Sequence, residues 1–454
     1  MAVIWAKQAL LPTGWSQDVM VSIFDDGKID SVQSGIDPSG QCVDILMPAP
    51  VNAHSHAFQR SMAGLTEHRG SDPNDSFWSW RKLMFRFLDQ LTPDQVQAVS
   101  AFVQMQMLQA GYATNVEFHY LHHQPDGMPY DNLAEMSERI IAAADQSGIG
   151  LTLLPVHYQF GGCDGRPLAE GQRRFGNNPD QFGKLCDLVQ KSLLQLPGDA
   201  MFGVAPHSLR AVNAGQFDAF SSLANGGPIH MHLAEQKAEV DEVRHILGCR
   251  PVEWVLENLD VNERWCMIHC TQLLPHETKG LARTGAIAGL CAITESSLGD
   301  GIFDAVGWFA NAGKIAVGSD SNIRISLAEE LRTLEYSQRL RDGTRAVMAT
   351  QKQSTGRRIF DAVCAGGTCA AGRKTGAIAA GNWADLLALD NDHPDLVGCR
   401  GDKILDAFIF CGGNEMVRDV WSAGRHLVQK GRHIKQDQIT RHYVDAVKQL
   451  RAMF

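Results

Sequence analysis

The sequence lacks the features that mark exported or membrane-spanning proteins. Its 454 residues contain eleven cysteines but no CxxC pair, and a chain of this length does not need disulfide staples to fold. No run of about 18 apolar residues occurs. The opening residues, MAVIWAKQALLPTG, lack the charged and then apolar segments of an export signal. We therefore expect reduced thiols, no membrane span and a cytoplasmic location.

Positive charge is also scarce. Lys and Arg number 41 against 51 Asp and Glu, which gives a formal net charge of -10, and this balance argues against a nucleic-acid partner. Hydrophobic residues make up 44% and charged residues 20% of the chain, as in ordinary globular proteins. The length favours one large α/β domain with a smaller companion.

Apolar, β-rich segments recur eight times in the middle of the chain. Between them lie stretches such as NLAEMSERIIAAADQSG, PDQFGKLCDLVQKSLLQL and AEVDEVRHILG, whose apolar residues recur at helical spacing. This alternation predicts an α/β fold, a parallel (β/α)8 TIM-like barrel over residues 47–375. The eight segments are ILMPAPVNA, YATNVEFHY, GLTLLPVHY, AMFGVAPHS, PIHMHLAE, WCMIHC, AIAGLCAIT and KIAVGSDSN.

The two ends of the chain have a different character. Residues 1–46 consist of short strand-like segments, with Asp26-Gly27 as a hairpin turn. Residues 376–435 return to this pattern in GAIAAGNWADLLALD, ILDAFIFCG and VRDVWSAGRHLVQKG. We predict one small β-sandwich domain formed from both chain ends, and a C-terminal helix over residues 436–454.

Two connections in the predicted barrel are long. One runs from Ala57 to Trp80 after the first barrel strand, and the other runs from Gly161 to Pro179 after the third. Long loops that follow barrel strands lie over the active face, so both are candidate substrate walls or lids.

Residues of metal-binding type follow several predicted barrel strands, where the active sites of such barrels lie. The spacing of two between His54 and His56 places both rings on one side of an extended backbone. Zn²⁺ accepts imidazole and carboxylate ligands and keeps one position open for water when it is catalytic. The candidate ligands are His54, His56, His232 and Asp320, and Glu235 and His269 follow strands five and six.

Each of these residues also has an ordinary explanation. A lone histidine after a strand is more often a buried, hydrogen-bonded side chain than a ligand. His230 shares the local chemistry of His232 but lies two positions earlier and deeper in the strand. It could equally be a core residue or a residue that supports a ligand, and we assign the ligand role to His232. The gathering of such residues at one face of the barrel favours a metal site. We expect one divalent ion, Zn²⁺, although Fe²⁺ accepts similar ligands.

An HxH pair on strand one, histidines on strands five and six and an aspartate on strand eight together resemble the amidohydrolase superfamily. The β-rich ends are similar to its split β-sandwich. The fourth strand segment, AMFGVAPHSLR, lacks the lysine of binuclear members, which points to the mononuclear deaminase branch. More narrowly, NAHSHAFQRSMAG, FWSWRKLMF, VEFHYLHH, APHSLRAV and HMHLAEQ are together similar to the N-formimino-L-glutamate deiminase family.

This resemblance implies an activity and a division of roles. The family converts N-formimino-L-glutamate to N-formyl-L-glutamate and ammonia in histidine degradation. Asp320 would accept the proton of the attacking water, Glu235 would protonate the leaving nitrogen, and His269 would orient the hydroxide or stabilise the adduct. The implied substrate contacts are Gln59, Arg81, Tyr120, His207 and Arg210. We also expect a homodimer.

Two arginines suit a small dianionic substrate, because a guanidinium group binds a carboxylate through two parallel hydrogen bonds. Taken singly, Arg81 or Arg210 would more often be a solvated surface residue. The alternative function is deamination of another amidine such as guanine, adenosine or a triazine, which calls for a flatter and largely uncharged pocket. A non-catalytic amidohydrolase-like scaffold is a further alternative, and the presence of Glu235 and Asp320 argues against it.

Overall fold

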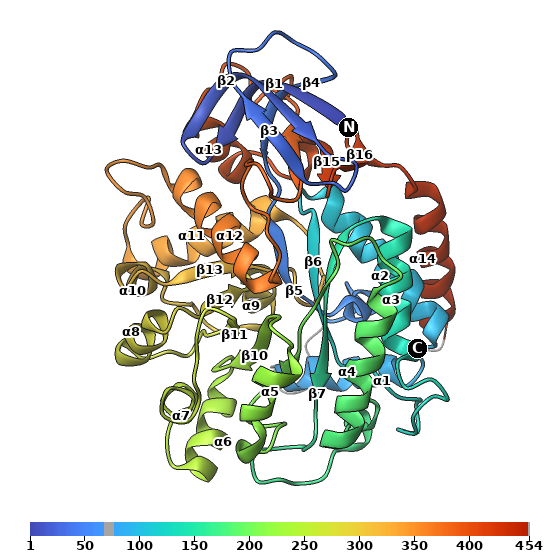
Figure 1. Ribbon diagram of the computed structural model, residues 1–454. Coiled ribbons are helices and arrows are strands. Elements are labelled where there is room, and N and C mark those ends of the chain that lie inside the picture. The colour runs from blue at the N-terminus through green and yellow to red at the C-terminus, as the bar shows by residue number, and fades with distance from the viewer. Residues whose placement is uncertain (68–76, 453–454) are drawn as a thin grey trace.

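The computed structural model describes residues 1–67 and 77–452 and consists of a barrel and a separate sheet (Figure 1). The parallel strands hydrogen-bond in the order β10-β11-β12-β13-β5-β6-β7-β8, and β9 also pairs with β7. A parallel bridge between Val204 and Ile229 joins the two edges of this sheet. The predicted (β/α)8 fold is therefore confirmed. Its strands are β5 (Val51–Ser55), β6 (Thr114–His119), β7 (Gly150–His157), β8 (Met201–Phe202) and β9 (Ala205–Pro206), which divide the fourth strand, β10 (Ile229–Leu233), β11 (Trp265–His269), β12 (Ile287–Leu290) and β13 (Lys314–Val317).

Helices surround the barrel and cover the outer face of its parallel strands from water. Every residue of β6 and β7 is buried. The three amphipathic stretches predicted as helices form α3, α4 and α6, and α4 starts where the Asn178 side chain accepts a hydrogen bond from the Gln181 backbone N–H. The helices are α1 (Phe77–Leu88), α2 (Pro93–Gln109), α3 (Glu135–Ser147), α4 (Pro179–Leu193), α5 (Asp218–Leu223), α6 (Lys237–Leu247), α7 (Pro251–Asn258), α8 (Pro275–Arg283), α9 (Ala292–Leu298), α10 (Ala305–Ala310), α11 (Leu327–Asp342), α12 (Thr355–Ala371), α13 (Asp402–Phe410) and α14 (Gln436–Arg451).

The two chain ends, predicted to form one small β-sandwich, contribute strands to one second sheet. Its strands follow one continuous order, β17-β16-β15-β14-β4-β1-β2-β3, and β1 and β4 are its parallel pair among the described residues. Asp26-Gly27 forms the turn between β2 and β3, where Gly27 has a φ of +91°. An apolar cluster that includes Val21, Leu386 and Trp421 draws on both chain ends. The strands are β1 (Ala2–Leu11), β2 (Gly14–Ile23), β3 (Ile29–Gln33), β4 (Gln41–Pro48), β14 (Leu386–Leu389), β15 (Val417–Ser422), β16 (Arg425–Gln429) and β17 (Arg432–His433).

One predicted strand is wrong. The segment ILDAFIFCG lies in helix α13, which begins at Asp402 after Gly401 and packs against α11 and α12. Its buried residues include Ile404, Leu405, Phe408 and Ile409, which share one helical face at spacings of three and four. A short apolar run has no clear period of its own, so packing against neighbouring helices decides its structure.

The C-terminal helix α14 packs against α2, and the rings of Phe102 and Tyr443 stack with centroids 3.8 Å apart. The last two residues of the range predicted for this helix lie outside the described residues.

Strand β4 continues to Pro48, just before the first barrel strand. The domain boundaries at residues 46, 375 and 435 stay predictions.

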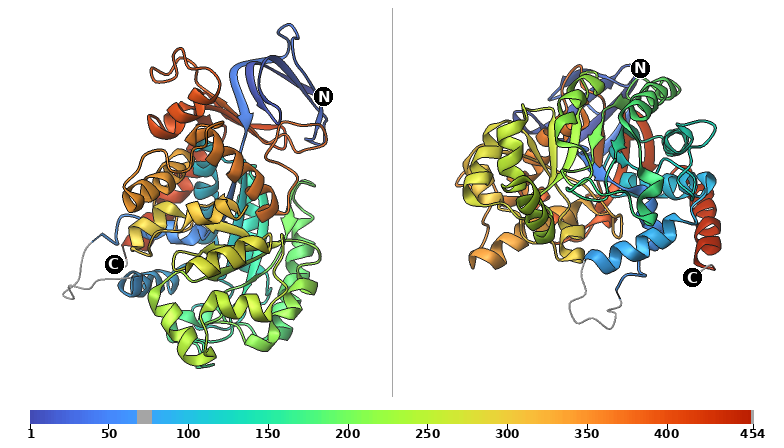
Figure 2. Two further views of the ribbon diagram at one scale, coloured as in Figure 1. Left: turned by 90° about the vertical axis from the view of Figure 1, so that its left-hand side faces the viewer. Right: turned by 90° about the horizontal axis from the view of Figure 1, so that it is seen from below.

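The second sheet and the predicted active face lie at opposite ends of the barrel (Figures 1 and 2). The two long connections fold partly into the short helices η1 (Ala57–Met62) and η2 (Glu170–Phe175). The centre of the first connection, residues 68–76, lies outside the described part of the chain. Within the described ranges, no helix combines the length and the apolar character needed to cross a membrane.

Candidate metal and substrate site

Four residues predicted as metal ligands converge at the carboxyl ends of the barrel strands. The Nε2 atoms of His54 and His56 lie 3.1 Å apart, and they lie 3.6 and 3.4 Å from Oδ1 of Asp320. Ligand atoms of His54, His56 and His232 lie within 4.8 Å of one another. All four side chains are buried.

The spacing of these atoms fits a single metal ion. Two ligands that each lie about 2.1 Å from a tetrahedral Zn²⁺ are roughly 3.3 Å apart. The measured separations of 3.1, 3.4 and 3.6 Å bracket that distance. Three imidazoles and one carboxylate are also a donor set that Zn²⁺ accepts.

Hydrogen bonds on the far side of two rings fix the tautomer that binding requires. Nδ1 of His56 donates to the Phe118 carbonyl at 2.9 Å, and Nδ1 of His232 donates to the His207 carbonyl at 3.3 Å, which leaves each Nε2 as an acceptor. Burial lowers the pKa of His56 to about 3, and burial with neighbouring imidazoles holds the pKa values of His54 and His232 well below the usual range. The rings are therefore neutral, which is the form that binds a metal.

His269 lies beside this set among carboxylates. Its Nε2 is 3.8 Å from Oε1 of Glu235 and 3.9 Å from Oδ2 of Asp320, and its Nδ1 is 3.2 Å from Oε1 of Glu295. Burial lowers the pKa of His269, but the carboxylates outweigh it and place that pKa well above its ordinary value. Burial raises the pKa of Asp320 to about 7, although the nearby His269 opposes this. The site therefore holds His269 within 4 Å of three carboxylates.

The backbone around His269 is strained. His269 and Cys270 have φ values of 72° and 52°, in the left-handed region that non-glycine residues rarely enter. Such conformations persist where surrounding contacts enforce them, and they concentrate at functional sites. The turn after β11 is therefore shaped to present the His269 ring.

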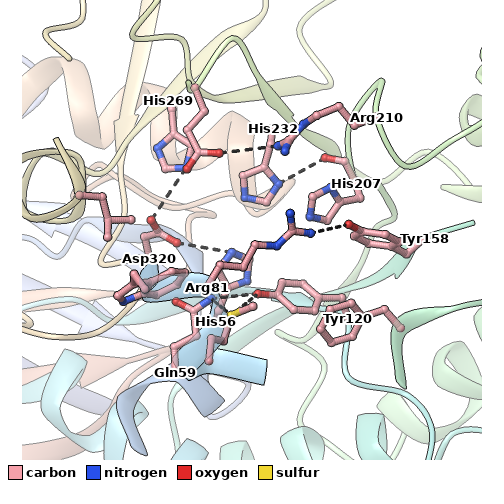
Figure 3. Close-up of a pocket in the computed structure, with 15 residues that line it drawn as sticks. His56, Gln59, Arg81, Tyr120, Tyr158, His207, Arg210, His232, His269 and Asp320 are labelled. Carbon is pink, nitrogen blue, oxygen red and sulfur yellow. Dashed lines mark hydrogen bonds and ion pairs between the residues drawn. The ribbon is translucent and has the colours of Figure 1, made fainter. Parts of the chain in front are cut away.

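Ten of the residues predicted from the sequence line one pocket (Figure 3). His54 is fully buried and is not part of the lining. The ten predicted residues that line the pocket are His56, Gln59, Arg81, Tyr120, His207, Arg210, His232, Glu235, His269 and Asp320.

Two arginines bring positive charge into this pocket. Nη2 of Arg81 donates to the Tyr158 hydroxyl at 3.1 Å, and Nη2 of Arg210 lies 4.0 Å from Oε2 of Glu235. Burial, together with the charges of Arg210 and Arg81, holds the pKa of His207 well below its ordinary value. The neutral His207 ring therefore lies within reach of both guanidinium groups.

Gln59 and Tyr120 form a polar pair in the pocket. The Gln59 Nε2 donates to the Tyr120 hydroxyl at 2.9 Å. The Gln59 Oε1 is buried and accepts no hydrogen bond from any described residue, so it can accept one from a ligand.

His230 lies deeper in the barrel than His232 and is bonded to the backbone of α12. Its Nε2 donates to the Ala370 carbonyl of α12 at 2.7 Å, and it is not among the residues that line the pocket. Because side chains alternate along β10, His230 and His232 share a direction, but His230 lies deeper in the strand.

The structure adds pocket residues that the sequence did not single out. Trp80 and Met84 share a helical face with Arg81 on α1, and this periodicity could have identified them. Tyr158 directly follows the third barrel strand, β7, and Phe175 lies in the long connection after it. The additional lining residues are Trp80, Met84, Tyr158, Phe175 and Leu298.

Comparison with known proteins identifies the relatives of the chain. Residues 45–427 match the amidohydrolase family, and residues 1–41 match the N-terminal domain of formimidoylglutamate deiminase HutF. Formimidoylglutamate deiminase of Pseudomonas aeruginosa is 43% identical over 99% of this chain and 100% of that protein.

Solved structures agree with these matches. The crystal structure of an amidohydrolase from Brucella melitensis is similar with a TM-score of 0.95 and 44% identity, covering 99% of this chain and 100% of that one. An adenosine deaminase from Xanthomonas campestris with bound zinc shares the fold with a TM-score of 0.82 at 21% identity, over 100% and 98% of the two chains. With matches that span both its barrel and its end sheet, the chain belongs to the amidohydrolase family and, within it, to the formimidoylglutamate deiminases.

Proposed function

We propose that the protein hydrolyses N-formimino-L-glutamate to N-formyl-L-glutamate and ammonia. The observation that carries this proposal is one pocket whose lining combines three of the four candidate ligands, His56, His232 and Asp320, with two guanidinium groups. His54, His56, His232 and Asp320 would hold one divalent ion, for which we propose Zn²⁺. Two guanidinium groups in the lining suit a substrate with two carboxylates better than a neutral purine or triazine, because a guanidinium binds a carboxylate through two parallel hydrogen bonds.

The reaction adds water across the C=N bond of the formimino group and releases its nitrogen. A bound Zn²⁺ supplies hydroxide near neutral pH by lowering the pKa of its water from about 15.7 to near 7. Asp320 accepts the water proton, and Glu235 donates a proton to the departing nitrogen. His269, within 4 Å of both carboxylates, donates a hydrogen bond that stabilises the developing negative charge.

The substrate carboxylates would bind at the arginines. We assign one carboxylate to Arg210 with His207 and the other to Arg81 with Tyr120, because each guanidinium lines the pocket. Gln59 Oε1, which has no partner among the described residues, would accept a hydrogen bond from a substrate N–H. These contacts hold the formimino carbon in a fixed position over the ligand set.

This activity belongs to histidine degradation, and we place it in the cytoplasm. All eleven cysteines are free thiols, as expected of a reducing compartment. A homodimer stays a prediction.

The decisive experiment measures ammonia release by the Zn²⁺-loaded protein from four compounds: N-formimino-L-glutamate, N-formimino-L-aspartate, guanine and adenosine. We expect the highest kcat/KM for N-formimino-L-glutamate. Faster turnover of guanine or adenosine would contradict the proposal.

Two variants separate binding from chemistry. Arg210→Met should raise KM about tenfold or more, because a charge-assisted pair is lost, while metal content is unchanged. Glu235→Gln should keep the metal and lower kcat by about a hundredfold or more, because the amide cannot donate the proton. Arg166→Met, at an exposed ion pair with Glu242 outside the pocket, is the control and should leave both constants unchanged.

A further inference from the structure

A buried carboxylate outside the pocket lining connects two functional groups. Glu239 lies in the first turn of α6 with a side chain that is 0% exposed. Its Oε1 accepts a hydrogen bond from the Ala234 N–H at 3.2 Å, and its Oε2 accepts one from the Glu235 N–H at 2.9 Å. One carboxylate therefore binds two consecutive amides of the turn between β10 and α6.

That turn needs an external restraint. Ala234 has a φ of 52°, a left-handed conformation that costs an ordinary residue about 1 kcal/mol. The Thr271 hydroxyl donates a hydrogen bond to the Glu235 carbonyl at 2.6 Å. Glu239 accepts the hydrogen bonds of the Ala234 and Glu235 amides. The orientation of the Glu235 side chain therefore depends on Glu239.

The same carboxylate also faces Arg210. The Arg210 Nη2 lies 4.0 Å from Oε2 of Glu239 and 4.0 Å from Oε2 of Glu235. The Arg210 side chain is only 11% exposed, so a nearby negative charge is needed to hold the buried guanidinium in place. Glu239 thus contacts both the backbone of Glu235 and the side chain of Arg210.

We propose that Glu239 is a positioning residue that fixes Glu235 and Arg210 relative to each other. This inference rests on the proposed function, because it assigns proton transfer to Glu235 and carboxylate binding to Arg210. Glu239 lies behind both groups and acts on the reaction through them.

The test compares Glu239→Gln with a matched control. The glutamine keeps the size of the side chain, but its NH₂ group cannot accept a hydrogen bond from a backbone amide and its charge is gone. Glu277 is the control because it is also buried, accepts the Leu274 N–H at 2.7 Å and binds Arg250 Nε at 2.9 Å, and lies outside the pocket lining.

We expect Glu239→Gln to lower kcat about a hundredfold, as misplacement of a reacting group by about 1 Å does. It should also raise KM for N-formimino-L-glutamate about tenfold, since the buried Arg210 guanidinium loses a negative charge 4.0 Å away. Hydrogen exchange of the Ala234 and Glu235 amides should become faster, whereas metal content should match the unmodified protein. Glu277→Gln should lower stability without changing kcat, KM or the exchange of these two amides.

The proposal is overturned if Glu239→Gln changes only stability, as the control does, or if its kinetic constants stay unchanged while the amides exchange faster. Hydrogen exchange keeps the test independent of the substrate. If the unmodified protein releases no ammonia from N-formimino-L-glutamate, the proposed function fails. Unchanged amide exchange would then still overturn the role of Glu239, and faster exchange would support it.

Discussion

Among single residues, Glu117 shows how far the barrel interior suppresses charge. It is 1% exposed, and its carboxylate accepts hydrogen bonds from the Ala57 N–H at 2.7 Å and the Asn115 Nδ2 at 3.1 Å. Burial nonetheless raises the pKa of Glu117 to about 7, because desolvation outweighs these bonds. Below that pH the folded protein carries a neutral acid that is hydrogen-bonded to the Ala57 N–H, next in the chain to His56.

This pKa predicts that stability depends on pH through Glu117. The folded pKa of about 7 lies above the value of 4.5 for an unperturbed glutamate, so the contribution to stability is fully present below 4.5 and is lost as pH rises to about 7. Glu117→Gln removes this titration. The Asn115 Oδ1 has no partner among the described residues, so a reoriented Asn115 amide can accept a bond from the glutamine.

We therefore expect the variant to gain about 2 kcal/mol relative to the unmodified protein between pH 5 and pH 7. Urea unfolding of both proteins at pH 5, 7 and 8 measures this difference, which should level off above pH 7. A difference that is constant with pH would show that Glu117 keeps an ordinary pKa in the folded protein.

The convergence of the candidate metal ligands could be predicted at this scale. The spacing of two between His54 and His56, at the end of an apolar strand, indicates a pair of ligands. His232 and Asp320 follow strands of the same kind. Tyr158 and Leu298 carried no comparable signal. An aromatic residue after a strand or an aliphatic residue at the end of a helix usually belongs to the core, and only the neighbouring elements leave a pocket beside it.

At the scale of elements, the site depends on the approach of β5 and β13. The His56 N–H donates to the Asp320 carbonyl and the Asp320 N–H donates to the His54 carbonyl, both at 2.9 Å. Gly318 permits this approach, because a Cβ at that position would lie 2.5 Å from the His54 nitrogen and 2.6 Å from its carbonyl oxygen. The pairing of these two strands brings ligands from opposite ends of the barrel sequence together.

We predict that Gly318→Ala displaces His54 and weakens metal binding. Overpacking of this kind costs about 1 to 3 kcal/mol, and loss of ligand geometry should lower metal affinity about tenfold or more. Metal content after dialysis and thermal unfolding measure the two effects. Gly183→Ala is the control, because a Cβ there meets nothing within 4 Å and alanine suits the interior of α4. Equal metal retention in both variants would contradict the prediction.

At the scale of the whole molecule, a buried ion-pair network joins the barrel to the end sheet. The Arg373 Nη2 lies 3.0 Å from both Asp385 Oδ1 and Asp199 Oδ2, and Arg425 binds Asp199 at 2.7 Å. Thr114, at the amino end of β6, donates to Asp385 Oδ2 at 3.0 Å. The network therefore lies at the end of the barrel opposite to the pocket.

Removing Arg373 should destabilise the protein without altering its chemistry. Arg373→Met leaves Asp385 and Asp199 buried without their shared cation, which costs about 3 to 5 kcal/mol. Denaturant unfolding should report this loss, while kcat and KM of the folded protein should stay unchanged because the network lies far from the ligand set. Arg432→Met, at an exposed pair with Asp437, should have little effect on either measurement. Comparable losses in the two variants would show that the network does not bind the two parts of the molecule together.

The sequence by itself determined the barrel, the β character of both chain ends and the ligand types, because strand and helix periodicity and residue chemistry are local properties. It misjudged α13, since a short apolar run takes its structure from its neighbours. Only the tertiary structure decided which histidine of β10 faces the pocket and that Tyr158 lies against Arg81. It alone placed Glu239 between Glu235 and Arg210. Those relations depend on distances between segments far apart in the chain, which no local pattern encodes.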